Sequence, residues 1–270
     1  MSRRTTQSHG RGDLFAAIFQ IHWRKTESIE SSYYMSTFPK RILITGGAHG
    51  IGAAVAQRSR EDGYEPVILD REGDDAIHCD LSDPDSTADA LRRALTDGPI
   101  TRLVNNVGAV FPNDAESQTL DEFDAAVALN LRSALQCTQA LLPGMRESGF
   151  GRIVSMSSRA ALGKELRSAY SATKAGLIGL TRVWALELGR FGVTANAIGP
   201  GPIATELFTR ANPANSPRTR MIVESVPVQR MGNADDVAHA VSYLLDDRSG
   251  FVTGQTLYVC GGVSVGRVDV

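Results

Sequence analysis

The chain contains little cysteine, and its cysteines are poorly placed for disulfides or metal binding. Its 270 residues include 3 cysteines, Cys79, Cys137 and Cys260, which lie far apart and form no closely spaced pair. Disulfide scaffolds and structural metal sites both need such spacing. We therefore expect reduced thiols in the core of a cytoplasmic protein, with no bound metal.

Long apolar runs and an excess of one charge are also missing. No run approaches the roughly 18 apolar residues of a membrane span. The 28 Lys and Arg residues nearly balance the 30 Asp and Glu residues, which argues against broad binding to nucleic acid or to anionic membranes. We expect a small-molecule partner, no nucleic acid and no membrane.

Residues 1–34 differ in composition from the rest of the chain. They mix Arg, Ser, Thr and His with one short apolar patch at 14–19, and they lack the layout of a signal peptide. Met35 stands just before the first strand-like run and is a natural start for a domain. We predict that 1–34 is an extension without a catalytic role, either disordered or packed on a neighbour, and that 35–270 is one domain.

From residue 40 onward, strand-like apolar runs alternate with helix-like segments, a pattern typical of a parallel sheet covered on both faces. The predicted strands are 41–45, 66–70, 76–79, 102–104, 152–156, 193–198 and 256–259, and the predicted helices are one ending near 62 and those at 84–95, 120–146, 169–190 and 234–246. The polar stretch 200–228 is predicted to be a mobile excursion. The sequence thus predicts one α/β domain with a doubly wound, seven-stranded parallel sheet and a ligand crevice at the carboxyl ends of its strands.

A glycine-rich turn, Thr45–Gly52, follows the first predicted strand and opens a helix. Free backbone N–H groups and the helix dipole make such a junction an anion site. In this interpretation Gly46 takes the tight turn, Gly50 lets a diphosphate approach the backbone, and Gly52 lets the helix pack on the strand. The alternative is a flexible turn without a ligand.

Asp70 ends the second predicted strand, 18 residues after Gly52. An acid near this position bonds the adenosine ribose in dinucleotide sites. Its carboxylate would repel a 2′-phosphate, so Asp70 favours NAD over NADP. Two alternatives stay open: Asp70 serves the turn only, or Arg71 binds the 2′-phosphate.

Tyr170 and Lys174 are four positions apart and share a face of a predicted helix. A free tyrosine has a pKa near 10, and a nearby ammonium group lowers that value by favouring phenolate. The pair therefore suggests a general acid/base. The alternative is a chance pair on a solvated helix face.

Two further polar residues accompany this pair. Ser158 follows the fifth predicted strand, where its hydroxyl can hydrogen-bond a substrate oxygen or merely close a turn. Asn130 lies inside a predicted long helix although asparagine is a poor helix former. We interpret it as a side chain that holds a water near Lys174; the alternative is a solvent-facing residue.

These residues resemble the short-chain dehydrogenase/reductase family over roughly residues 40–262. The matching positions, in the family's order, are Thr45–Gly52, Asp80, Asn105, Asn106, Gly108, Asn130, Ser158, Tyr170, Lys174, Pro200 and Gly201. The resemblance implies a Rossmann-type fold. It implies that Tyr170 is the general acid/base, Ser158 orients the carbonyl or alcohol, and Asn130 completes a proton relay. Lys174 would bind the nicotinamide ribose and lower the tyrosine pKa.

The same resemblance implies a set of cofactor-binding residues. Among them, Asp80 would hold adenine N6 and Leu81 would donate from its backbone, although Asp80 also suits a helix cap near Asp83. The full set is Gly46, His49, Gly50, Ile51, Gly52, Asp70, Asp80, Leu81, Asn106, Gly108, Tyr170, Lys174, Pro200, Gly201, Ile203 and Thr205.

Three positions depart from the family's pattern. Val107 replaces a common alanine, and Cys260 replaces a common aspartate before two glycines. The loop leading to Tyr170 is one residue short, which leaves either Ser157 or Ser158 as the catalytic serine. Ungapped matching of the preceding strand favours Ser158.

We therefore expect an NAD(P)-dependent oxidoreductase that passes hydride between nicotinamide and a secondary alcohol or ketone. The alternatives are an NADP-linked 3-oxoacyl thioester reductase and a non-enzymatic dinucleotide sensor, against which the intact Ser158, Tyr170 and Lys174 argue. The substrate depends on 159–168, 203–226 and the chain end. Within the first of these segments, three cations either indicate an anionic substrate or are solvated loop charges: Arg159, Lys164 and Arg167.

The resemblance also implies a homotetramer formed through the two long helices. Six apolar residues of these helices are expected either to supply the interface or to fill the monomer core: Leu131, Leu135, Leu141, Leu177, Leu180 and Trp184.

Overall fold

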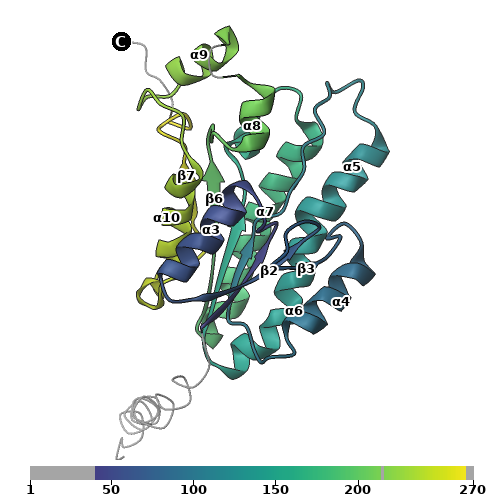
Figure 1. The fold of residues 1–270 in the computed structure, drawn as a ribbon, viewed down its shortest axis with the longest axis vertical. Coiled ribbons are helices and arrows are strands. Elements are labelled where there is room, and N and C mark those ends of the chain that lie inside the picture. The colour runs from purple at the N-terminus through teal and green to yellow at the C-terminus, as the bar shows by residue number, and fades with distance from the viewer. Residues whose placement is uncertain (1–39, 214–215, 266–270) are drawn as a thin grey trace, which may run out of the picture. The chain divides into compact units, whose positions relative to one another are not determined.

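The computed structural model describes residues 40–213 and 216–265, so the predicted extension 1–34 lies outside the described residues. Strands and helices alternate through this part of the chain (Figure 1). The strands are β1 (Arg41–Thr45), β2 (Glu65–Asp70), β3 (Ala76–His78), β4 (Arg102–Asn105), β5 (Gly151–Met156), β6 (Val193–Pro200) and β7 (Thr256–Val259). The helices are α3 (Gly50–Glu61), α4 (Pro84–Ala94), α5 (Leu120–Val127), α6 (Ser133–Glu147), α7 (Ser168–Leu188), α8 (Glu206–Ala211), α9 (Pro217–Glu224) and α10 (Ala234–Leu245).

The strands form one sheet in the order β3-β2-β1-β4-β5-β6-β7, and every neighbouring pair is parallel. The chain winds outward from β1 to β3 and then returns to place β4 on the other side of β1. Ligands bind at such a reversal, in the crevice outside the carboxyl ends of the strands. The predicted α/β, doubly wound, seven-stranded Rossmann-type domain is confirmed.

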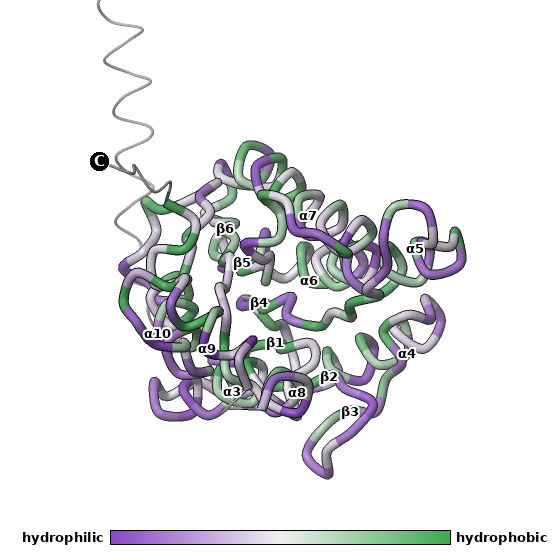
Figure 2. The backbone as a smooth tube through the Cα atoms, turned by 90° about the horizontal axis from the view of Figure 1, so that it is seen from above, coloured by the Kyte–Doolittle hydropathy of each residue, from purple (hydrophilic) through white to green (hydrophobic). Residues whose placement is uncertain are grey.

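Alternating side chains of the strands build two cores. Leu43 of β1 packs with Leu141 and Trp184 on the face covered by α4, α6 and α7. Ile44 packs on the other face with Val241 of α10 and with residues of α3. Figure 2 shows these two groups of helices on opposite sides of the sheet. The sheet is therefore buried on both faces and offers ligands only its edges.

The predicted long helix 120–146 is interrupted. A π-helical segment, Ala128–Arg132, separates α5 from α6 and contains Asn130, which is 1% exposed. A π turn commonly marks a functional position. The predicted excursion at 200–228 contains two short helices, α8 and α9.

Among the described residues, no helix combines the length and the apolar character needed to cross a membrane. The three cysteines are buried and unpaired.

Candidate active site

The glycine turn joins β1 to α3 in a conformation that suits a dinucleotide. Gly46 and Gly50 have positive φ angles of 66° and 55°, which cost a side-chain-bearing residue energy. A Cβ on Gly52 would lie 2.0 Å from the Gly46 carbonyl oxygen. The first turn of α3 contains no acidic residue, and His49 at its N-cap makes no side-chain capping bond. The N–H groups of this helix end are therefore available to a diphosphate.

Two polar side chains, one at the end of β1 and one from the loop after β4, shape this turn. Thr45 Oγ1 accepts hydrogen bonds from the N–H groups of Asn106 and Val107 at 3.0 and 3.1 Å. The Asn106 amide donates to the carbonyls of Thr45 and Gly46 at 3.0 and 2.8 Å. The loop after β4 is thereby tied to the loop after β1, and the crevice lies between them.

Thr205 brings the polar excursion against the glycine turn. It caps α8 by accepting from Phe208 N at 3.3 Å, and its Cγ2 lies 3.5 Å from where a Cβ on Gly50 would stand. The start of α8 therefore stands beside the glycine turn. Ile203, which precedes it, is 7% exposed and forms a bridge with Gly232.

Asp70 lies at the end of β2, beside the same turn. One carboxylate oxygen accepts from Ala48 N at 3.0 Å and the other from Glu72 N at 3.3 Å. Glu72 lies 3.7 Å from His49, measured between carboxylate oxygen and ring nitrogen. This rim of the crevice is therefore rich in carboxylates, and Asp70 is already bonded to the backbone that a diphosphate would contact.

Asp80 and Leu81 follow β3. The hydroxyl and the N–H of Ser82 both donate to Asp80, at 2.6 and 2.9 Å, and they hold the pKa of its carboxyl below the ordinary value. Asp83, not Asp80, caps α4 by accepting from two N–H groups. Leu81 is 4% exposed and packs in the core, so only its backbone is available to an adenine.

Asn130 points into the protein. Its oxygen accepts from Ala109 N at 2.8 Å, and its amide nitrogen donates to Ala109 O at 2.9 Å and to Thr173 Oγ1 at 3.1 Å. The side chain thus joins the loop after β4 to α7. The sequence interpretation assigned it a different role, binding a water molecule near Lys174. The sequence did not predict a role for Thr173. Its position next to Lys174 would indicate one only if the face of α7 that contacts Asn130 were already known.

Lys174 is 3% exposed, and its ammonium donates to Met156 O at 2.7 Å. Burial lowers its pKa to about 8. A Cβ on Gly108 would lie 3.0 Å from Lys174 Nζ and 3.2 Å from Asn130 Oδ1. Only glycine therefore fits at 108 without displacing these two side chains.

Tyr170 lies one helical turn before Lys174, whose Nζ is 5.6 Å from the centre of the phenol ring. Burial raises the pKa of Tyr170, and a hydrogen bond with Ser158 and the positive charge of Arg167 act in the opposite direction. The sequence interpretation assigned the lowering to Lys174. In the protein alone, the positive charge that acts to lower the tyrosine pKa is that of Arg167, and the lowering by Lys174 stays a prediction.

The two adjacent serines have different partners. The Ser157 hydroxyl is buried and donates to Lys174 O at 2.7 Å. Ser158 caps the following 3₁₀ turn by accepting from Ala160 N at 3.1 Å, and it faces Tyr170. Only Ser158 is therefore placed beside the phenol.

Gly201 follows Pro200 at the end of β6, and it serves packing. A Cβ there would lie 2.6 Å from Cys260 Cα. Cys260 Sγ lies 3.1 Å from Ser264 Oγ, and hydrogen bonds from this hydroxyl and from backbone N–H groups lower the thiol pKa against the opposing effect of burial.

In the described part of the chain, no group of three or more His, Cys, Asp or Glu side chains is arranged to hold a metal.

The structure thus brings a dinucleotide-type glycine turn and a serine, a tyrosine and a lysine to one edge of a doubly wound sheet. This combination defines a nicotinamide-dependent oxidoreductase that acts on alcohol or keto groups.

Comparisons with known proteins agree. A family model described as enoyl-(acyl carrier protein) reductase matches residues 46–264. The chain is 36% identical over 241 residues to "(2S)-[(R)-hydroxy(phenyl)methyl]succinyl-CoA dehydrogenase subunit BbsD" of Thauera aromatica, with 83% of this chain and 96% of the relative covered. It is 36% identical to acetoacetyl-CoA reductase of Shinella zoogloeoides, with 82% and 96% covered.

A solved structure of a blue fluorescent protein from a metagenomic library, in complex with NADPH, is also similar. It superposes with a TM-score of 0.76 at 31% identity, covering 83% of this chain and 97% of that one. The chain belongs to the short-chain dehydrogenase/reductase family.

Proposed function

We propose that the protein interconverts a secondary alcohol and a ketone with NAD as cofactor, using Tyr170 as general acid/base. The observation that carries the proposal is the position of Tyr170 between Ser158 on one side and Lys174 on the other. The bound nicotinamide would accept or supply the hydride. The residues of this chain position the substrate and move the proton.

In reduction, the Tyr170 hydroxyl donates its proton to the developing alkoxide of the substrate. Burial raises the pKa of this phenol, so the donor is fully protonated near neutral pH, as a general acid must be. The Ser158 hydroxyl donates to the same substrate oxygen and holds it beside the tyrosine.

In oxidation, the phenol must first lose its proton. Ser158 and Arg167 both lower its pKa, and a positively charged nicotinamide ring would act in the same direction. Lys174 is predominantly protonated below its pKa of about 8, and we propose that it binds the nicotinamide ribose. Asn130 serves this site by fixing the loop at Ala109 against α7, and its predicted part in a proton relay remains a prediction.

We favour NAD over NADP because carboxylates line the rim where the adenosine ribose would lie. Asp70 and Glu72 are adjacent there, and His49 is paired with Glu72. A 2′-phosphate would meet this negative charge, and the cations on this side are Arg71, which follows Asp70, and Arg60 of α3, which lines the hollow beside Gly47 and Ala48. The remaining cofactor contacts are proposed as the sequence predicts them, with the adenine near Asp80.

A second candidate, reduction of a 3-oxoacyl thioester, is favoured by the relatives. One is named acetoacetyl-CoA reductase, and another, from Mycobacterium avium and 34% identical, is named 3-oxoacyl-[acyl-carrier-protein] reductase MabA. The chemistry at Tyr170 is the same in both candidates, and they differ in what is attached to the ketone.

We also propose that the protein is a cytoplasmic homotetramer. Its free thiols suit a reducing compartment. Exposed apolar side chains on the helices provide a surface for association, and they are Leu120, Phe123, Leu135, Val183 and Leu186.

A panel of ketones and secondary alcohols assayed with NADH, NADPH and their oxidised forms tests the activity. The variant Tyr170→Phe is expected to lower kcat by about 10²–10⁴ while the fluorescence-measured Kd for NADH stays unchanged. The matched control is Tyr243→Phe, because Tyr243 is 52% exposed on α10.

Each outcome decides one point. Full turnover by Tyr170→Phe would remove the proposed acid/base. Tight NADH binding without turnover of any substrate would support a dinucleotide sensor. A higher kcat/KM with NADPH than with NADH would overturn the cofactor preference.

A further inference from the structure

We propose that a pocket beside the active site binds an anionic group of the substrate, a carboxylate or a phosphate. The inference rests on the proposed function and specifies its substrate class: alcohols or ketones that carry a negative charge away from the reacting carbon.

The pocket is an open hollow of about 460 Å³ at the N-terminal end of α7. It is lined by Asp114, Ala115, Gly163, Lys164, Glu165, Leu166, Arg167, Ser168 and Ser171. Ser168 and Ser171 of α7 flank Tyr170 in the chain, and the charge of Arg167 acts on its phenol, so the pocket lies near the position proposed for the reacting oxygen.

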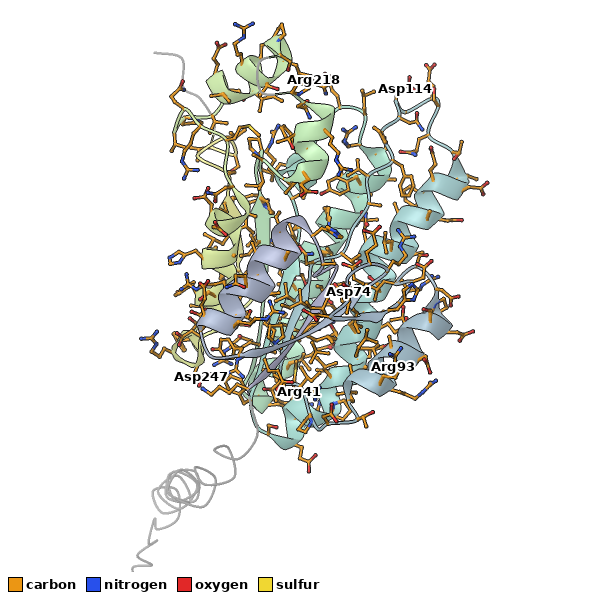
Figure 3. All side chains as sticks on the ribbon, in the orientation of Figure 1. Arg41, Asp74, Arg93, Asp114, Arg218 and Asp247 are labelled. Atoms are coloured by element: carbon orange, nitrogen blue, oxygen red, sulfur yellow. The ribbon has the colours of Figure 1, made fainter. Side chains whose placement is uncertain are left out.

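Two cations, Lys164 and Arg167, line this pocket, and two more, Arg159 and Arg218, lie within electrostatic reach of Lys164. Lys164 stands in its wall, and burial together with the positive charges of Arg159, Arg167 and Arg218 lowers the lysine pKa. Arg218 comes from α9, a different part of the chain from the 159–167 segment. It lies at the same end of the molecule as Asp114 (Figure 3). Two separate segments therefore bring like charges within electrostatic reach of one another.

These cations have few protein partners. In residues 40–213 and 216–265, the side chains of Arg159, Lys164 and Arg218 make no ion pair or hydrogen bond. The side chain of Arg167 donates only to Leu166 O, at 2.7 Å. Like charges held near one another without direct ion pairs destabilise each other. An oxyanion bound among them would relieve that repulsion.

Two carboxylates also line the pocket, and they do not cancel the positive charge. Asp114 accepts from Ser117 N at 2.7 Å, a bond that, with the Ser117 side chain, holds its pKa low. Glu165 faces the same hollow. Two cations and two carboxylates thus line the pocket, Arg159 and Arg218 add positive charge near Lys164, and one of the carboxylates is engaged by its own loop.

Uncharged donors are available in the same place. The Ser171 hydroxyl oxygen is buried and has no hydrogen-bond partner in the structure. At the start of α7, Arg167 occupies the N-cap position without a side-chain capping bond, and the first turn contains no acidic residue. The N–H groups of that turn and the positive end of the helix dipole therefore complement the cations.

The pocket is electrostatically coupled to the reacting group. Arg167 lines the pocket and also lowers the pKa of Tyr170 by its charge. An anion bound at Arg167 and a carbonyl held at Tyr170 would therefore belong to one small molecule. This arrangement would select charged substrates over their neutral esters.

Two matched pairs of ketones test the proposal and separate the two sources of negative charge. Acetoacetate and methyl acetoacetate differ in a carboxylate, while acetoacetyl-phosphopantetheine and acetoacetyl-pantetheine differ in a phosphate. The double variant Lys164→Met/Arg218→Gln is expected to raise KM about tenfold for the charged member of one pair, with KM for the neutral members unchanged. The control is Arg93→Gln, since Arg93 lies exposed on α4 at a distance from Arg218 (Figure 3).

Calorimetric titration of the NADH-saturated protein with the same four compounds separates this proposal from the proposed function. Binding of a charged compound that the double variant loses supports the pocket even if no ketone is reduced. Reduction of the ketones with equal KM in wild type and double variant would overturn the pocket and leave the oxidoreductase activity intact. Failure of both charged compounds to bind more tightly than their neutral partners would also overturn it.

Discussion

Ser157 and Ser158 show how one position along a chain changes the chemistry available to a side chain. Both follow β5, where successive side chains point in opposite directions. Ser157 is turned inward to the Lys174 carbonyl, whereas Ser158 faces the phenol of Tyr170. The sequence favoured Ser158 by ungapped matching of the strand, although the loop that follows is one residue short and kept Ser157 as the alternative. The direction of each hydroxyl is a property of the folded backbone.

We expect Ser158→Ala to lower kcat by about 10²–10³, since it removes one hydrogen bond to the reacting oxygen. The same variant should raise the pKa of Tyr170 further, because the hydrogen bond with Ser158 favours phenolate. Tyrosinate absorbance, followed against pH with Tyr170→Phe as the reference, measures this shift. Ser157→Ala should leave the titration of Tyr170 unchanged; the opposite pattern would make Ser157 the catalytic serine.

The glycine turn and the interrupted helix 120–147 are the elements that build the crevice. In the turn, Gly52 in the first turn of α3 lies so close to Gly46 that a Cβ would meet the Gly46 carbonyl. In the helix, the π-helical segment directs Asn130 inward to Ala109 and Thr173. The sequence showed the close packing of the turn through the spacing of its glycines. It showed the π-helical segment only through an asparagine inside a helical pattern, and an asparagine alone does not predict a π turn.

We expect Gly52→Ala to destabilise the protein by about 1–3 kcal/mol and to weaken NADH binding, because the start of α3 must move away from Gly46. Gly189→Ala is the matched control: Gly189 also has a helical conformation, with φ −53°, and a Cβ there meets nothing within 4 Å. The control should keep wild-type NADH affinity and thermal stability. Thermal unfolding and NADH titration of both variants check this, and equal behaviour of the two would contradict the packing argument.

At the scale of the whole molecule, the apolar residues of the long helices divide between core and surface. The sequence left open which of these residues fill the core and which form an interface between subunits. Leu141, Leu177 and Trp184 are 1%, 1% and 5% exposed, so for these three the core alternative is confirmed. Leu135 is 36% exposed and Leu186 is 86% exposed. An exposed leucine surface of this kind is typical of protein association.

We expect the wild-type protein to be a tetramer in light scattering after size-exclusion chromatography, and Leu186→Glu to be smaller, because a carboxylate buried in an apolar interface has no partner. Met221→Glu is the control, since Met221 is exposed at 69% on α9, away from the long helices. A wild-type monomer at micromolar concentration, or an equal effect of both variants, would contradict a tetramer built on α7.

The order of strands and helices, the glycine turn and the positions of Tyr170 and Lys174 were all determined by local sequence. Each depends on periodicity, on the backbone freedom of glycine or on the spacing of a helical turn, and these act between residues that are near in the chain. Three features were decided only by tertiary structure. The Lys174 ammonium is directed toward Met156 O, the charge of Arg167 acts on Tyr170, and the charge of Arg218 acts on Lys164. Burial and charge depend on which distant segments the sheet brings together, so no local pattern could supply them.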